Sequence, residues 1–285
     1  MEPDSPGRRP VDERSDVVVP TPSARSEDGT LARAVRVLAA FTAPDRELSG
    51  AELARRSGLP RSTTHRVAAE LVATGLLEQT PAGRLRLGMR LFELGHLALF
   101  QRGLRESASP FLADLASVTH ETVHLAVLEG LDVVYIDIIR PSGAPVLRSR
   151  VGGRLPPSTT GVGKAMLAYS APELVDAVIA QGLPRLTPYS ITDGTRLRAE
   201  LVEVRRTGLS FDNQEQAIGT ICCAAPIFGV GGQLVGAISV SGRLGVLRLD
   251  RVKMAVRTAA AGISRLQGHQ RLARPGAVGT QPAGT

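Results

Sequence analysis

Five neighbouring side chains in the first third of the chain have the chemistry that DNA recognition requires. They are Arg61, Ser62, Thr63, His65 and Arg66, and they fall within the first two turns of one expected helix. A guanidinium group can make two hydrogen bonds to guanine O6 and N7, and hydroxyl groups can reach bases or phosphates. Because the amino end of a helix also favours phosphate, this arrangement predicts a recognition helix for a DNA major groove.

The residues before this set predict the element that positions it. Ser49 to Glu52 forms a capping-box pattern, in which the Ser49 hydroxyl accepts from the Glu52 amide and the Glu52 carboxylate accepts from the Ser49 amide. Two arginines, a serine and a glycine at 55–58 are typical of a helix end. Pro60 then fixes φ near the helical value and can open a second helix. The spacing indicates a helix-turn-helix.

Two short extended segments follow the second helix. Residues 76–79 and 84–87 flank a Pro-Ala-Gly turn, so they are expected to pair as a wing. Alternation along the second segment sends two leucines to one side and two arginines, including Arg84, toward the DNA backbone. A small helical bundle whose arginines are merely solvated is the alternative. The order and lengths of box, turn and wing favour the winged helix-turn-helix, over residues 30–88.

A helix beginning at Thr30 is expected to pack on this unit. Its apolar residues at spacings of three and four are Leu31, Val35, Leu38 and Phe41, and Arg33 lies off that stripe, near a phosphate position. Residues 30–90 hold ten arginines against five acidic residues, whereas residues 1–29 hold four against seven. The basic part of the chain is therefore the expected DNA-binding module. Residues 1–29 are expected to be a disordered acidic tail.

The remaining residues predict a linker helix and a second, α+β domain. Residues 89–102 are apolar nearly all round, which favours a linker helix, expected over residues 89–106, that packs against its copy in a second subunit. A buried helix of one large domain is the alternative. Within 107–267, Pro110 is expected to open a helix, and residues 122–128 and 133–139 form an antiparallel hairpin. Residues 268–285 are expected to be a flexible tail. The further expected strands are 146–150, 221–227 and 234–241, and the further helices are 164–169, 173–180, 195–207 and 251–266.

The only two cysteines, Cys222 and Cys223, are adjacent. Neighbours on one strand face opposite ways, so the pair can neither staple the domain nor chelate a metal. The sequence predicts a reduced, cytoplasmic protein with no signal peptide, no membrane segment and no cofactor. A thiol nucleophile would need a base, and His120 or His124 could serve. A cysteine-based redox sensor or hydrolase fused to a DNA-binding module is therefore the alternative to a protein that is not an enzyme.

Several separate motifs, in order over about Thr30 to Leu266, resemble the IclR (isocitrate lyase regulator) family of bacterial transcription factors. The motifs are Ala51-Glu-Leu-Ala-Arg-Arg-Ser-Gly-Leu-Pro60, Thr122-Val-His-Leu-Ala-Val, Arg150-Val-Gly-Gly-Arg-Leu-Pro156, Gly163-Lys-Ala-Met-Leu-Ala168, Cys222-Cys-Ala-Ala-Pro226 and Ser239-Val-Ser-Gly242. The resemblance implies a winged helix-turn-helix, a linker helix and a GAF-like α/β effector domain with an antiparallel sheet. It also implies homodimers or homotetramers on a palindromic DNA operator.

The resemblance implies an effector site as well. Asp212, Cys222, Ser239 and Ser241 match family positions that contact effector, and Ser239 and Ser241 share one strand face because they are two residues apart. Residues 159–163 lead into a helix whose first amides, at Gly161 and Val162, favour an anion. An ionised carboxylate only accepts, so Asp212 would require a donor on the ligand.

The expected effector is a small polar organic acid such as glyoxylate or a related ureide-type acid, and the expected protein is a repressor. Two departures from the family pattern affect this expectation. Ser158 stands where the family often has histidine, and Asp212-Asn-Gln-Glu215 replaces an acidic Asp-x-Glu-Glu stretch. The stretch Gly161 to Lys164 lacks the glycine and hydroxyl positions of a nucleotide phosphate loop, so nucleotide binding is not expected.

Overall fold

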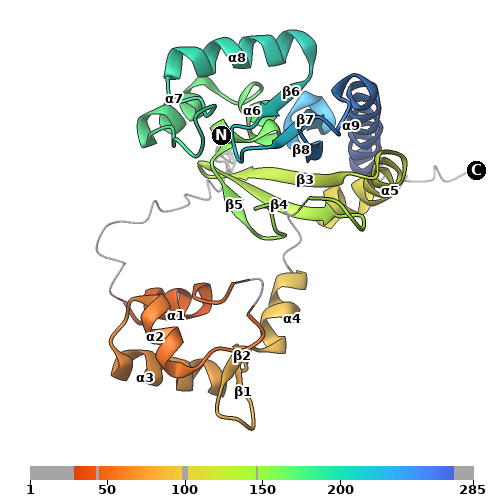
Figure 1. Ribbon diagram of the computed structural model, residues 1–285. Helices are drawn as coiled ribbons and strands as arrows, with labels where there is room; N and C mark the ends of the chain where they lie inside the picture. Colours follow the sequence, from red (N-terminus) through yellow and green to blue (C-terminus); the bar gives the residue numbers. More distant parts are fainter. Residues whose placement is uncertain (1–28, 43–44, 98–101, 146, 273–285) are drawn as a thin grey trace, which may run out of the picture. The chain divides into compact units, whose positions relative to one another are not determined.

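The computed structural model describes residues 29–42, 45–97, 102–145 and 147–272 of the 285-residue chain (Figure 1). It divides into two compact units, one ending at His96 and one beginning at Leu97. Residues 1–28 and 273–285 of the two expected tails lie outside the described residues. Residues 268–272, which the sequence analysis places in the second tail, instead belong to the last helix.

The first unit is a helical core with a two-stranded hairpin. Its helices are α1 (Thr30–Ala39), α2 (Gly50–Ser57), α3 (Arg61–Ala73) and α4 (Met89–Leu97), and its strands are β1 (Leu77–Gln79) and β2 (Leu85–Leu87). β1 and β2 pair in antiparallel fashion (Figure 1). Val37, Leu53 and Val67, one from each of α1, α2 and α3, lie in one buried cluster with Leu77 and Leu85 of the hairpin. This confirms the winged helix-turn-helix.

The ends of α2 are fixed by local hydrogen bonds. The Ser49 hydroxyl accepts from the Glu52 amide at 3.2 Å, as the capping box predicts. The Glu52 carboxylate, however, binds Arg55 and Arg56 at 2.6 Å, so the reciprocal half of the box is replaced by ion pairs along the helix. Gly58, at φ 65°, ends the helix in the left-handed conformation that glycine adopts without strain.

The stripe predicted for α1 is partly wrong. Val37 and Phe41 are buried, but Leu31 and Val35 are 79% and 58% exposed. The helix carries apolar side chains at more positions than its neighbours can cover, and the covered face is centred on Val37. In the wing, Leu85 is buried as expected, whereas Leu87 is 46% exposed. Hydrophobic periodicity alone does not decide which of two adjacent stripes faces the core.

The second unit is built on one six-stranded antiparallel sheet with the order β5-β4-β3-β8-β7-β6. The predicted hairpin of β3 and β4 is confirmed, as is the α+β fold. The edge strand is β5 rather than residues 146–150; residues 147–150 form no strand, and residue 146 lies outside the described residues. The strands are β3 (Thr122–Glu129), β4 (Asp132–Ile139), β5 (Arg154–Leu155), β6 (Ser210–Asn213), β7 (Thr220–Phe228) and β8 (Leu234–Arg243).

Helices cover both faces of this sheet (Figure 1). Leu112 and Ile263 belong to the α5 and α9 side chains that form a large apolar cluster on one face. Val162 and Met166 of α6 pack on the other face, with α7 and α8 beyond them. The helices are α5 (Arg102–Thr119), α6 (Gly161–Leu167), α7 (Pro172–Gln181), α8 (Gly194–Thr207) and α9 (Leu249–Leu272). No helix among the described residues is long and apolar enough to cross a membrane.

Pro110 does not open a helix, contrary to the sequence prediction. It lies inside α5, which begins eight residues earlier at Arg102. A proline inside a helix removes one backbone hydrogen bond, to the carbonyl four residues earlier. Pro110 and Glu106 are both exposed, so water can satisfy that carbonyl and the helix continues. The expected linker helix over 89–106 therefore corresponds to α4 and the start of α5, with residues 98–101 outside the described residues.

Candidate functional site: a DNA-reading helix and a ligand pocket

The outer face of α3 has the composition that the sequence predicts. Arg61, Ser62, His65 and Arg66 are exposed and Thr63 is half-buried. The inner face carries Val67, Ala68 and Leu71 in the core, together with Thr64, whose hydroxyl donates to the Pro60 carbonyl at 3.1 Å. Pro60 is the residue before the helix, so the amino end of α3 lies at Arg61. The predicted base-reading side is thus open and is not part of the protein's own core.

The arginines around this face differ in how they are held. Arg66 pairs with Glu70 at 2.9 Å and Arg84 approaches Glu47 at 3.5 Å, and all four side chains are more than a third exposed. Exposed pairs of this kind contribute about 0–1 kcal/mol, so a phosphate can replace the carboxylate at small cost. Arg61 has no ion pair with any described residue. Arg33 on α1 is only partly exposed.

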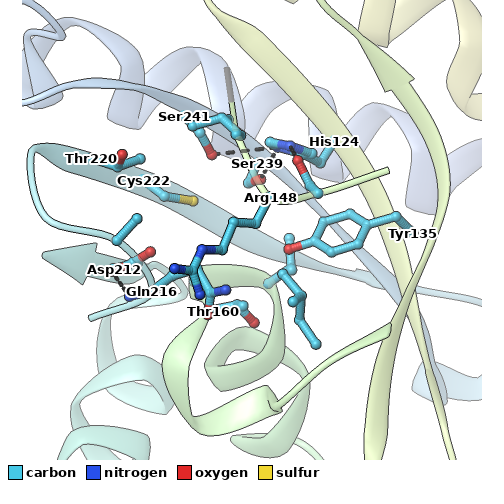
Figure 2. Close-up of a pocket in the computed structure, with 16 residues that line it drawn as sticks. His124, Tyr135, Arg148, Thr160, Asp212, Gln216, Thr220, Cys222, Ser239 and Ser241 are labelled. Atoms are coloured by element: carbon cyan, nitrogen blue, oxygen red, sulfur yellow. Dashed lines mark hydrogen bonds between the residues drawn. The ribbon is translucent and has the colours of Figure 1, made fainter. Parts of the chain in front are cut away.

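One pocket in the second unit brings together the predicted effector residues (Figure 2). It lies between the sheet face on which α6 packs, the start of α6 and the segment before β5. Four further residues line it that no sequence motif assigns to the site: Arg148, Gln216, His124 and Tyr135. The predicted effector residues that line the pocket are Gly161, Val162, Asp212, Cys222, Ser239 and Ser241.

The strand register explains why these residues meet. Asp212 on β6 is opposite Cys222 on β7, and Cys222 is opposite Ser241 on β8. His124 on β3 is opposite Ser239 on β8. Directly paired residues point to the same face of a sheet, so these five side chains form two rows on the pocket side. Cys223, the next residue along β7, lies in the opposite cluster with α5 and α9, as expected.

A neutral hydrogen-bonded cluster forms one wall of the pocket. His124 Nε2 lies 2.8 Å from the Ser149 hydroxyl, and Nδ1 lies 3.3 Å from Ser239 and 3.4 Å from Ser241. Burial lowers the pKa of His124 to about 3, so the ring carries no charge at neutral pH. Three serine hydroxyls therefore satisfy a buried histidine, and the same hydroxyls face the pocket.

Asp212 forms the opposite wall. Its Oδ1 accepts from the Glu215 amide at 2.7 Å, in the turn between β6 and β7. Burial and the nearby Glu215 carboxylate raise the pKa of Asp212 to about 7. At neutral pH this side chain is protonated in a substantial fraction of molecules, and it can then donate a hydrogen bond as well as accept one. The sequence-based view of Asp212 as an acceptor only is therefore incomplete.

Lys164 forms ion pairs close to Asp212. The side chain is fully buried in α6, and its amine donates to Glu215 at 2.7 Å and to Glu200 of α8 at 3.1 Å. Two carboxylates thus neutralise the lysine and tie α6, α8 and the β6–β7 turn together. The amine is engaged with protein carboxylates, which agrees with the rejection of a nucleotide phosphate loop at Gly161–Lys164.

The environment of Cys222 does not favour the reactive thiolate that a catalytic cysteine requires. Burial, together with the charge of Asp212, raises the pKa of Cys222 to about 11, whereas nucleophilic cysteines have a lowered pKa. His124 is held neutral by burial and is engaged with serines, so it does not form an ion pair with the thiol. No cluster of metal-binding side chains occurs among the described residues.

A recognition helix with an open basic face, in a chain whose second domain holds a polar ligand pocket, defines a ligand-responsive DNA-binding transcriptional regulator. The model of the IclR helix-turn-helix domain matches residues 30–81, and the model of the bacterial transcriptional regulator IclR C-terminal domain matches residues 96–265. The chain therefore belongs to the IclR family, whose members are transcriptional regulators and not enzymes.

Relatives with known names cover most of the chain. Transcriptional repressor IclR of Escherichia coli is 32% identical over 250 residues, which are 86% of this chain and 89% of the relative. HTH-type transcriptional regulator BhcR of Paracoccus denitrificans is 35% identical over 75% of this chain and 78% of its own length. An IclR homologue from Microbacterium hydrocarbonoxydans, solved in complex with 4-hydroxybenzoate, is 33% identical with a TM-score of 0.77, covering 84% of this chain and 99% of that one.

Proposed function

We propose that this regulator is a repressor whose operator affinity is changed by a small organic acid bound in the effector-domain pocket. The observation that carries the proposal is the pocket itself, because it gathers a protonatable carboxyl, two serine hydroxyls and an amide side chain around one space. Ligand pockets combine apolar walls with a few convergent polar groups in this way. The apolar walls here include Val162 and Leu155.

The similar Microbacterium protein supports an acid as the ligand class. Its structure contains 4-hydroxybenzoate, which has a carboxylate at one end and a hydroxyl at the other. The pocket of this chain has hydrogen-bonding groups on two opposite walls, at Asp212 and at the serine–histidine cluster. We therefore propose an acid that carries a hydroxyl or carbonyl group, a class that includes both glyoxylate and hydroxybenzoates.

Isothermal titration calorimetry with a panel of acids tests this proposal. The panel contains glyoxylate, pyruvate, allantoate and 4-hydroxybenzoate, and 4-hydroxybenzamide is the neutral control. At least one acid is expected to bind and to change the affinity for operator DNA. Heat from the neutral compound alone, with none from any acid, would overturn the acid proposal while leaving the family assignment untouched.

On the DNA side, we propose that the protein binds a palindromic operator as a homodimer or homotetramer. The residues proposed to contact DNA are Arg33, Arg61, Ser62, Thr63, His65, Arg66 and Arg84. Two copies of α3, one from each subunit, would occupy successive major grooves. The exposed apolar side chains of α4, with Met89 at 62% and Leu97 at 72% exposure, support the proposal that this helix packs against a second copy.

A further inference from the structure

Arg148 is an exposed arginine that lines the pocket and has no side-chain partner among the described residues. It lies on the segment between β4 and β5, and its side chain extends into the space lined by Asp212, Gln216 and Thr160 (Figure 2). Within the described residues Arg148 forms no hydrogen bond and no ion pair. Among the described residues that line the pocket, Asp212 is the one carboxyl group, and burial keeps it partly protonated at neutral pH.

The backbone beside Arg148 is held in place. The next residue, Ser149, is buried; its hydroxyl lies 2.8 Å from His124 Nε2, and its carbonyl accepts from Arg140 at 3.3 Å. Arg148 therefore leaves an anchored point of the backbone, and its exposed side chain lines the pocket. A positioned guanidinium is the side chain best suited to a carboxylate, because its planar fork matches two oxygens.

Gln216 supplies a second unmet polar group in the same region. The side chain is only 9% exposed, its Oε1 accepts from the Thr159 hydroxyl at 2.7 Å, and its Nε2 is buried with no partner among the described residues. A buried donor without an acceptor is costly, so a ligand oxygen at this position would remove the cost. Rotation of the amide would exchange its two ends, and a bound carboxylate would favour the orientation with Nε2 toward the ligand.

The far wall has a different chemistry. Ser239 and Ser241 surround the neutral His124, so this wall offers hydrogen bonds without a positive charge. Tyr135 and Cys222 lie between the two walls, and both are buried. The pocket is therefore polarised: one end holds the Arg148 cation, the unpartnered Gln216 Nε2 and the Asp212 carboxyl, and the other end holds hydroxyl groups around a neutral histidine.

We propose that Arg148 and Gln216 bind the carboxylate of the effector, while the serine–histidine cluster receives a neutral hydroxyl or carbonyl group at its other end. This inference rests on the proposed function and makes it more specific. It assigns to Arg148 the discrimination between a carboxylate and an uncharged group of the same shape. The protein thus selects hydroxy or oxo carboxylates with a short apolar body.

The test compares 4-hydroxybenzoate with 4-hydroxybenzamide, and the other acids of the panel with their amides, by calorimetry. The variants are Arg148→Gln and the matched control Arg150→Gln, which removes an exposed arginine two residues away that does not line the pocket. Arg148→Gln is expected to weaken the acid about 10- to 100-fold and to leave the amide within about twofold. Arg150→Gln is expected to change neither affinity.

The outcomes separate this inference from the proposal on which it rests. If the wild-type protein binds an acid and Arg148→Gln binds it equally well, the role of Arg148 is overturned and the acid proposal stands. Equal weakening of acid and amide would also overturn it, because that result indicates a structural role. Binding of amides but of no acid by the wild-type protein would overturn both. A thermal melting curve for each variant checks that the fold is retained.

Discussion

At the scale of the residue, Asp212 is an acidic side chain whose protonation is strongly tied to the fold. The pKa of its carboxyl is about 7 in the folded protein and 3.8 in a model compound. The folded protein therefore holds a proton that the unfolded chain has released, in the interval from about pH 4 to pH 7. The free energy of unfolding consequently falls as pH rises through that interval, since the native state binds more protons.

The variant Asp212→Asn tests this linkage. Asparagine keeps an oxygen that can accept from the Glu215 amide, but it has no charge to bury. At pH 8 the variant is expected to have a free energy of unfolding about 1–3 kcal/mol higher than the wild-type protein, and near pH 4 the difference should vanish. Urea unfolding followed by circular dichroism at the two pH values measures this. A difference that is constant with pH would contradict the cause given for the raised pKa.

The arginines of the DNA-binding unit have separable roles. Arg61→Ala should lower the affinity for operator DNA by about 1–3 kcal/mol and relax the preference at one operator position, because it would remove the proposed base contact. Arg84→Ala should weaken binding to operator and random DNA alike and reduce its salt dependence, because it would remove the proposed phosphate contact. Fluorescence anisotropy with both duplexes measures the affinities.

Arg196→Ala, which removes an exposed arginine from the effector domain, is the control for the change in net charge. It should leave the affinities for both duplexes unchanged. Equal losses on operator and random DNA for Arg61→Ala and Arg84→Ala would show that α3 is not the recognition helix.

Single residues also show where sequence reasoning is sufficient. Ser239 and Ser241 share a face because side chains alternate along a strand, and family motifs point to Asp212, Cys222 and Gly161. Arg148 and Gln216 lie outside strands and helices, so neither strand nor helix periodicity predicts where their side chains point. Their places depend on tertiary contacts, such as the hydrogen bond between Ser149 and His124, that a linear pattern does not contain.

At the scale of the element, the start of α6 is the part most closely fitted to the pocket. A Cβ atom added to Gly161 would lie 2.9 Å from Cys222 Sγ and 3.4 Å from the Ala224 Cβ. Both neighbours belong to β7, which is paired on both sides, with β6 and β8, so its backbone cannot move without disturbing the sheet. The absence of a side chain at Gly161 therefore sets how closely α6 approaches β7.

Gly161→Ala is expected to weaken binding of the effector acid at least about tenfold and to destabilise the effector domain by about 1–3 kcal/mol. Gly50→Ala is the matched control, since Gly50 is likewise the first residue of a helix and an added Cβ would meet nothing within 4 Å. Calorimetry and thermal unfolding of both variants give the comparison. If Gly161→Ala binds the acid as the wild-type protein does, the close approach of α6 and β7 is not what shapes the pocket.

The elements also divide into those that the sequence predicts and those that it does not. The β3–β4 hairpin follows from two β-branched runs around a short polar turn, and the helix-turn-helix follows from its capping residues. The prediction that Pro110 opens a helix is wrong. Pro110 and Glu106 are exposed, so water can satisfy the unpaired carbonyl and α5 continues through the proline. The two-residue strand β5 is too short to show the alternation of polar and apolar residues that marks a strand. Only its pairing with β4 identifies it as a strand.

At the scale of the whole molecule, regulation requires that a ligand distinguish two states of the protein. A ligand shifts operator affinity only by as much as its own affinity differs between those states. The linkage is reciprocal, so operator DNA must change the affinity for the acid by the same factor. Calorimetry of the acid with and without operator DNA is expected to show a changed acid affinity, and an acid affinity that operator DNA leaves unchanged would contradict the coupling.

The central claim is that this chain reads a specific operator and that a carboxylic acid changes its affinity for that operator. The most direct measurement selects duplexes from a random library with the purified protein and then determines the affinity for the selected sequence with and without each acid. The account predicts enrichment of a palindromic sequence and a shift in affinity with at least one acid that Arg148→Gln reduces. Absence of any enriched sequence, or the same affinity with every acid present, would contradict it.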